Sequence, residues 1–208
     1  MKNTVFFLFL LFLGFSSCKK GKANFTLKGT ITDSTFNSGL SGATVRLYAT
    51  EAGTAITNQI ASGTLDAQGN YSFTFSRDKI ETYYLKVEKV NYFDVYEAIP
   101  FSSLTIEEDN VRNYSTTAQG WVKFHLVNNN PLTSDVLEYI RQEGKTDCEE
   151  CCPSGYRYYY GAVDTTFYCV NDGNAVYSGY YWVQGGGVQG PIWTISTAFD
   201  TVDVNITY

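Results

Sequence analysis

Residues 66–75 read Asp66-Ala67-Gln68-Gly69-Asn70-Tyr71-Ser72-Phe73-Thr74-Phe75, and they give the clearest local indication of β-structure in the chain. Its first half consists of turn-forming residues, because Asp and Asn side chains bond to nearby backbone and Gly tolerates a positive φ. Its second half alternates aromatic and polar side chains with a period of two, which indicates a strand with one buried face. The stretch therefore predicts a turn that leads into a β-strand.

The same alternation recurs on both sides of this stretch. Apolar residues alternate with polar ones at residues 25–31, 43–49 and 83–87, and residues 39–42 supply a further turn. The composition, with 17 Tyr, 14 Phe and a single Met, is typical of β-structure. About seven short strands with regular turns are typical of a β-sandwich.

Three stretches resemble the carboxypeptidase regulatory-like, transthyretin-like domain. They are residues 29–33 (Gly-Thr-Ile-Thr-Asp), residues 39–45 (Gly-Leu-Ser-Gly-Ala-Thr-Val) and residues 66–75 with the centre Gly69-Asn70-Tyr71. The resemblance covers residues 24–106 and implies a small β-sandwich, often an appendage on bacterial cell-envelope proteins. The transthyretin-like fold also hosts a hydroxyisourate hydrolase, but this chain lacks the several His and Arg residues that its active site needs.

A second β-rich segment follows. Residues 107–113 are polar and charged and predict a linker, and residues 114–208 predict a second β-sandwich with a disulfide-linked loop. We expect strands near 122–127, 166–170, 177–183, 192–198 and 200–208, and a strand rather than one helical turn at 136–140. This half looks similar to the C-terminal domains of uncharacterised envelope lipoproteins. The predicted fold class is all-β, with two consecutive antiparallel sandwich domains that are transthyretin-like or immunoglobulin-like.

The start of the chain predicts export and a lipid anchor. Residues 5–15 form an apolar run that is too short to span a bilayer, which needs about 20 residues. This run fits the apolar part of a signal peptide, which we place at residues 1–17. Residues 15–18 (Phe-Ser-Ser-Cys) resemble the lipobox of bacterial lipoprotein precursors, and this implies cleavage before Cys18 and acylation of Cys18. The alternative is an ordinary secretory peptide with an incidental cysteine.

The anchor also predicts a location. Residues 18–23 would form the lipid anchor and a short linker, and their basic side chains would favour an anionic membrane surface. We expect the membrane to be a partner through this anchor. The predicted location is the cell envelope of a Gram-negative bacterium, in the outer membrane, with the choice between the periplasmic and the surface-exposed leaflet left open.

The remaining cysteines are Cys148, Cys151, Cys152 and Cys169. An even number outside the cytoplasm predicts two disulfides. Adjacent cysteines rarely bond to each other, so we expect one local bridge from Cys148 and one longer bridge to Cys169, with the exact connectivity left open. A Cys₄ zinc site would need two separated Cys-x₂-Cys pairs, which are absent. We therefore expect no metal and no cofactor.

Catalytic residues are not evident. The single histidine, His125, falls on the polar face of its expected strand, where it would be solvated. Nucleophilic triads normally need a histidine base, so this chain offers little for one. The formal net charge of −6 argues against a nucleic-acid partner. The prediction is that the protein is not an enzyme.

Aromatic residues crowd the second half and suggest a ligand surface. A run such as 158–160 (Tyr-Tyr-Tyr) cannot place every ring on one face of a strand, so some rings must lie outside. Exposed rings often mark binding surfaces, and flat rings suit sugars. The candidate ligand-binding residues are Tyr158, Tyr159, Tyr160, Tyr181, Trp182 and Trp193. The alternative is that cross-strand pairs of rings only stabilise the sheet.

Together these features predict a non-catalytic, lipid-anchored envelope protein that acts as a binding or scaffolding module for a carbohydrate or protein ligand. A structural subunit that assembles by strand exchange through residues 200–208 is one alternative. An envelope hydrolase with two converging carboxylates is another.

Overall fold

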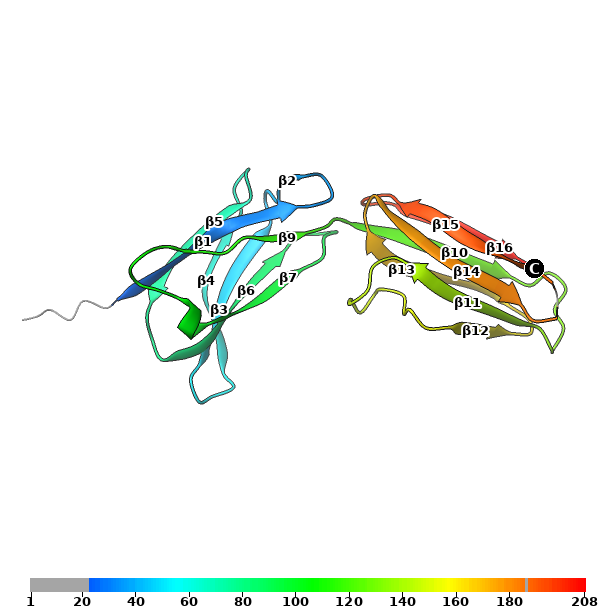
Figure 1. Cartoon of the computed structure of the whole chain (residues 1–208), viewed down its shortest axis with the longest axis horizontal. Helices are drawn as coiled ribbons and strands as arrows, with labels where there is room; N and C mark the ends of the chain where they lie inside the picture. Colours follow the sequence, from blue (N-terminus) through cyan, green and yellow to red (C-terminus); the bar gives the residue numbers. More distant parts are fainter. Residues whose placement is uncertain (1–22, 186) are drawn as a thin grey trace, which may run out of the picture.

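The computed structural model describes residues 23–185 and 187–208, so the predicted signal peptide and Cys18 lie outside the described part. Two β-sandwiches follow one another along the chain and lie end to end (Figure 1). This confirms the predicted all-β fold. The described residues form strands throughout, apart from loops and one 3-10 helix, η1 (Phe101–Ser103). Within them, no helix has the length and apolar character needed to cross a membrane.

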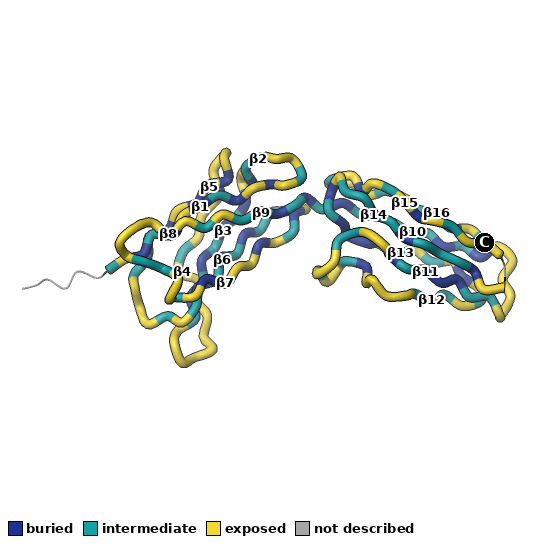
Figure 2. Tube along the Cα trace, in the orientation of Figure 1, coloured by how far each residue is buried: buried dark blue, intermediate teal, exposed yellow. Residues whose placement is uncertain are grey.

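The first sandwich packs two sheets around one core. Its strands are β1 (Asn24–Asp33), β2 (Ser38–Gly39), β3 (Thr44–Glu51), β4 (Thr57–Thr64), β5 (Asn70–Ser76), β6 (Ile80–Glu88), β7 (Val95–Pro100), β8 (Asn110–Val111) and β9 (Tyr114–Thr116). One sheet has the order β2-β1-β5, with β8 and β9 also paired to β1, and the other has the order β4-β3-β6-β7. Residues 66–75 form the turn before β5 and most of β5, and Tyr71, Phe73 and Phe75 of β5 lie in the core. Buried positions recur along the strands of both sandwiches (Figure 2).

Strands β8 and β9 correct the predicted domain boundary. Residues 110–111 and 114–116 pair in parallel with β1, so the expected linker 107–113 is partly a strand of the first sandwich, which runs to Thr116. The polar sequence was misleading because Asn110 is buried and its side-chain amide donates to the carbonyls of Thr26 and Thr105. Gly29 permits this close pairing, since a Cβ there would lie 1.7 Å from the carbonyl oxygen of Arg112.

The second sandwich also has two sheets. Its strands are β10 (Gln119–Val127), β11 (Val136–Glu143), β12 (Arg157–Tyr160), β13 (Asp164–Asp172), β14 (Ala175–Val183), β15 (Gln189–Ser196) and β16 (Thr201–Thr207). The sheets have the orders β13-β10-β16 and β12-β11-β14-β15. Strand β11 confirms the expected strand at 136–140. Strand β16 is at the edge of its sheet and runs parallel to β10, just as β8 and β9 run parallel to β1, so these three pairings are exceptions in the otherwise antiparallel sandwiches.

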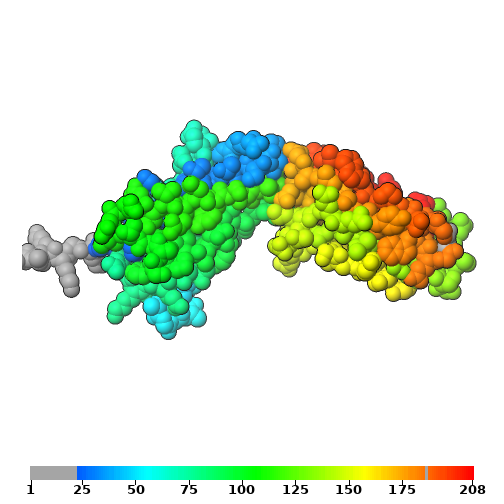
Figure 3. All heavy atoms as spheres, viewed as in Figure 1, coloured from blue at the N-terminus to red at the C-terminus, as the bar shows by residue number. Residues whose placement is uncertain are grey.

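The two sandwiches contact each other directly. The backbone N–H of Ala118, between β9 and β10, donates to Thr35 Oγ1 of the first sandwich at 2.9 Å. The ring of Phe36 stacks on that of Phe199, with centroids 5.7 Å apart. In Figure 3 the blue end of the first sandwich touches the orange and red part of the second. The predicted linker is therefore replaced by a short, packed junction.

Tyr83 leads to a prediction about alkaline stability. Its side chain is 1% exposed, and its hydroxyl has no hydrogen-bond partner among the described residues. Burial raises the pKa of Tyr83 to about 12, from about 10 in an unfolded chain. Above pH ~10 the unfolded chain therefore releases this proton while the folded chain keeps it, so the free energy of unfolding falls as pH rises from about 10 to about 12.

We expect Tyr83→Phe to flatten this alkaline loss, measured by circular dichroism during denaturant titrations at several pH values. At neutral pH it should raise the free energy of unfolding by about 1 kcal/mol, because it removes an unpaired buried hydroxyl. Tyr71→Phe is the matched control, since the Tyr71 hydroxyl donates to the Arg112 carbonyl at 2.8 Å, and its loss should destabilise. A Tyr83→Phe variant less stable than the parent at neutral pH would contradict the prediction.

Candidate binding face

The sheet β12-β11-β14-β15 carries exposed aromatic rings on its outward side. The strand register places Tyr158, Glu138 and Trp182 next to one another across β12, β11 and β14. Tyr160 and Trp193 lie on the same side and are 68% and 66% exposed. We call this side the outer aromatic face. Its rings are Tyr156, Tyr158, Tyr160, Tyr180, Trp182 and Trp193.

Two of the predicted ligand-binding residues do not belong to this face. The ring of Tyr159 packs on Phe167 of the opposite sheet, with centroids 6.0 Å apart and planes 13° apart. Tyr181 lies opposite Tyr139 on the inward side and packs against the core. Because successive side chains of a strand point to opposite faces, Tyr159 and Tyr181 turn inward when Tyr158, Tyr160 and Trp182 turn outward. Ligand binding by the other four residues, Tyr158, Tyr160, Trp182 and Trp193, stays a prediction.

The outer aromatic face also contains residues that were absent from the predicted set. The ring of Tyr156, in the loop before β12, meets Trp182 edge-on with centroids 5.7 Å apart. Tyr180 is two residues before Trp182 on β14, and their centroids are 6.2 Å apart. The period-two rule could have identified Tyr180. The place of Tyr156 could not have been inferred, because it depends on the path of a loop.

Glu138 lies between the rings. It is only 8% exposed although it is on the outward side, because its neighbours across the sheet are Tyr158 and Trp182. Its Oε1 accepts a hydrogen bond from Nε2 of Gln184. Its Oε2 accepts no hydrogen bond from the described part of the chain. This oxygen retains some exposure to solvent. The pair thus offers a carboxylate acceptor and an amide beside flat apolar rings.

Charge on this face is sparse and negative. Among the outward positions of the four strands, only Glu138 and Glu143 carry charge. The two nearby arginines point elsewhere: the guanidinium of Arg157 lies 5.0 Å from the centroid of the Phe167 ring, and Arg141 is buried and donates to the Lys145 carbonyl. The face therefore has no cation for a phosphate or a sulfate.

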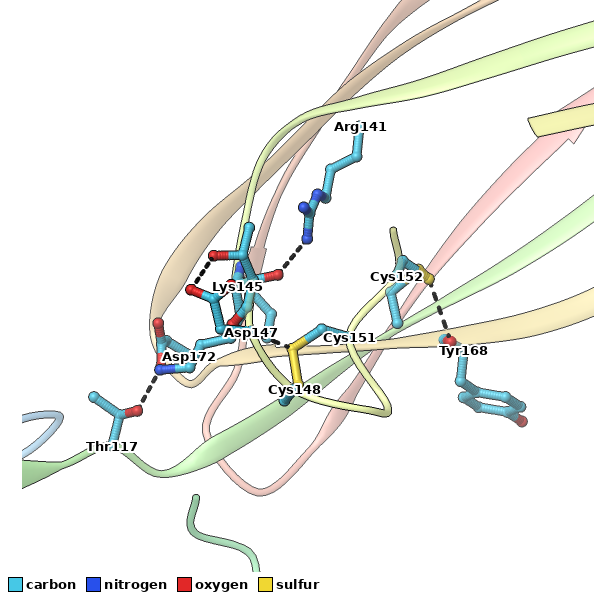
Figure 4. Close-up of a disulfide and its surroundings, with 12 residues drawn as sticks. Thr117, Arg141, Lys145, Asp147, Cys148, Cys151, Cys152, Tyr168 and Asp172 are labelled. Carbon is cyan, nitrogen blue, oxygen red and sulfur yellow. Dashed lines mark hydrogen bonds and ion pairs between the residues drawn. A yellow bond between two sulfur atoms is a disulfide. The ribbon is translucent and has the colours of Figure 1, made fainter. Parts of the chain in front are cut away.

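Two disulfides hold the loop that leads to Tyr156. Cys148 bonds to Cys151 and Cys152 bonds to Cys169, with Cα–Cα distances of 5.1 and 5.0 Å. This confirms the predicted local and longer bridges and answers the question of connectivity. Figure 4 shows the loop beside the junction, where Lys145 Nζ pairs with Asp172 Oδ1 at 2.9 Å. Because all four sulfurs are bonded, these cysteines are not arranged as zinc ligands.

His125 lies where the sequence predicted, on the solvent side of β10. Its Nε2 is 3.0 Å from Oδ1 of Asp164, and both side chains are largely exposed. No nucleophilic side chain completes a triad with this pair among the contacts of the described residues. The geometry is that of a solvent-exposed hydrogen bond between two surface side chains.

Comparison with known proteins gives no assignment of family. No family model and no curated protein matches the chain. Among solved structures it is similar to the Bacillus anthracis TIE protein, with 14% identity, a TM-score of 0.38, and coverage of 89% of this chain and 34% of that one. It is also similar to the Streptococcal ancillary pilin, with 13% identity, a TM-score of 0.34, and coverage of 88% and 62%. It is similar as well to GBS52, the minor pilin of Streptococcus agalactiae, with 14% identity, a TM-score of 0.36, and coverage of 88% of this chain and 94% of that one.

The chain spans about a third of the TIE protein chain, which is the first of these similar structures. TM-scores of 0.38 or less are too low for these similarities to indicate an activity or a partner. The carboxypeptidase regulatory-like resemblance of residues 24–106 stays a prediction.

Proposed function

We propose that this protein is a non-catalytic binding module of the bacterial cell envelope, with the outer aromatic face as its ligand surface. The observation that carries the proposal is the exposure of several large rings on one side of one sheet. Tyr158, Tyr160 and Trp193 are each about half exposed or more. Tyr158 and Tyr160 are neighbours on β12, and clustered exposed rings of this kind mark interaction sites in soluble domains.

The proposal includes the lipid anchor. Acylation of Cys18 would hold the chain at the membrane, and the first sandwich begins shortly after it, at Asn24. In Figure 1 the first sandwich lies at the N-terminal end and the second extends away from it. The outer aromatic face would then be held away from the membrane surface, on the distal half of the protein. The ligand is a glycan or a protein, and the compartment is that of a Gram-negative envelope.

Binding measurements on the purified chain test this proposal. The panel contains purified polysaccharides, neutral and anionic, and purified surface proteins. We expect at least one saturable interaction that Trp182→Ala weakens at least tenfold, because a central ring in an interface often contributes more than 1.4 kcal/mol.

Trp121→Ala is the matched control, since Trp121 points outward from the other sheet of the same sandwich. It should leave that affinity unchanged. Binding that responds equally to both substitutions, or no binding to any member of the panel, would contradict the proposed surface.

The two alternatives have less support. Strand exchange through residues 200–208 would require β16 to leave β10, to which it is paired from Thr201 to Thr207. A hydrolase would need converging carboxylates. The junction cleft is lined by Asp94, Asp147, Glu149 and Glu150, but all four residues are exposed to solvent, and no contact between a base and a nucleophile accompanies them within residues 23–185 and 187–208.

A further inference from the structure

We infer that the ligand of the outer aromatic face is a neutral polysaccharide, bound by ring stacking and by hydroxyl contacts with Glu138 and Gln184. This inference rests on the proposed function and names the class of ligand for its surface. It follows from three properties of the face: the sign of its charge, the placement of its polar pair and the arrangement of its rings.

The charge of the face selects against anionic ligands. Among the described outward positions of its four strands, only Glu138 and Glu143 are charged, both are negative, and the chain as a whole carries −6. A polyanion such as nucleic acid or a sulfated or uronate-rich glycan would meet repulsion without a compensating Lys or Arg. A neutral polymer of sugars has no such penalty, because it brings no charge to the surface.

The polar pair is suited to hydroxyl groups. Oε1 of Glu138 is held by the Gln184 amide, which fixes the carboxylate between Tyr158 and Trp182 and leaves Oε2 as an acceptor. A hydrogen bond from a neutral hydroxyl to a carboxylate is shorter and stronger than one between two neutral groups. Gln184 adds an amide oxygen, so the pair can hold a sugar hydroxyl in a defined place. A purely apolar partner would leave this carboxylate desolvated at a cost.

The rings form two neighbouring rows. Tyr158 and Tyr160 follow one another on β12, with centroids 6.4 Å apart and planes 24° apart. Tyr180 and Trp182 follow one another on β14, and β11, without an aromatic ring on its outward side, runs between the two rows. The C–H face of a pyranose ring stacks on an aromatic ring through dispersion and through attraction to the negative ring face. Successive rings along a strand suit successive sugars of one linear chain.

Isothermal titration calorimetry on the purified chain provides the test. The probes are soluble neutral β-glucan, xylan and mannan, with alginate and heparin as anionic counterparts. We expect at least one neutral polymer to bind, with an affinity that is constant over a tenfold range of salt concentration. Trp182→Ala should weaken this binding at least tenfold, and Glu138→Gln should weaken it about three- to tenfold because the charged acceptor is lost while the shape is retained.

Each other outcome has a definite meaning. Binding of alginate or heparin alone, or salt-dependent binding that Trp182→Ala abolishes, overturns the neutral-polysaccharide inference but keeps the proposed binding face. Dimerisation in analytical ultracentrifugation that Trp182→Ala abolishes also overturns the inference, since a second copy then covers the face. If Trp182→Ala leaves the binding of every probe unchanged, or if no probe binds and no dimer forms, both the inference and the proposed function are contradicted.

Discussion

We expect Phe124→Ala to lower the free energy of unfolding of the second sandwich by about 4 kcal/mol, because it removes the central ring of that core and leaves a cavity. Phe124 is 0% exposed. Its ring stacks on Phe167, with centroids 4.8 Å apart and planes 8° apart, and it lies 5.3 and 5.8 Å from the rings of Tyr139 and Tyr177. These contacts join both sheets of the sandwich, so the loss is not local to one strand.

Urea unfolding followed by tryptophan fluorescence measures this effect. All three tryptophans, Trp121, Trp182 and Trp193, lie in the second sandwich, so the signal reports on that half alone. Tyr160→Ala is the control, because this ring is 68% exposed and its removal should change the free energy of unfolding by no more than about 0.5 kcal/mol. Similar losses for the two variants would show that Phe124 does not organise the core.

The second large effect concerns the bridge between Cys152 and Cys169. We expect the Cys152→Ala/Cys169→Ala double variant to lose about 3 kcal/mol of unfolding free energy in the chain-entropy model, because the bridge closes a loop over a sequence separation of 17. Cys169 is fully buried and Cys152 nearly so, which adds a packing contribution to the loss. The same fluorescence experiment under non-reducing conditions measures the change.

The Cys148→Ala/Cys151→Ala double variant is the matched control, since its bridge spans a separation of only 3 and should contribute about 2 kcal/mol or less. The longer bridge also ends four residues before Tyr156, whose ring touches Trp182. Loss of the longer bridge should therefore weaken binding at the outer aromatic face, whereas loss of the shorter one should not. Equal losses of stability in the two double variants would contradict this assignment.

Much of the architecture could be predicted from local pattern. The alternation in residues 43–49 and 71–75 identified the inward side chains correctly, because the side-chain period of a strand follows from backbone geometry. The same rule places the side chains of Tyr159 and Tyr181 on the inward face, once those of Tyr158 and Trp182 are known to point outward. The prediction failed there because a run of aromatic residues has no polar partner to indicate which rings lie outside.

The all-β class, the presence of two sandwiches, the two disulfides and the aromatic character of the second half could be predicted from the sequence, since each depends on neighbouring residues or on residue type. The three-dimensional fold was needed to show that residues 110–116 join the sheet of β1, that β16 runs parallel to β10, and that Glu138 lies between Tyr158 and Trp182. These features are pairings between segments far apart in the chain. Their energy comes from backbone hydrogen bonds and packing that no local pattern encodes.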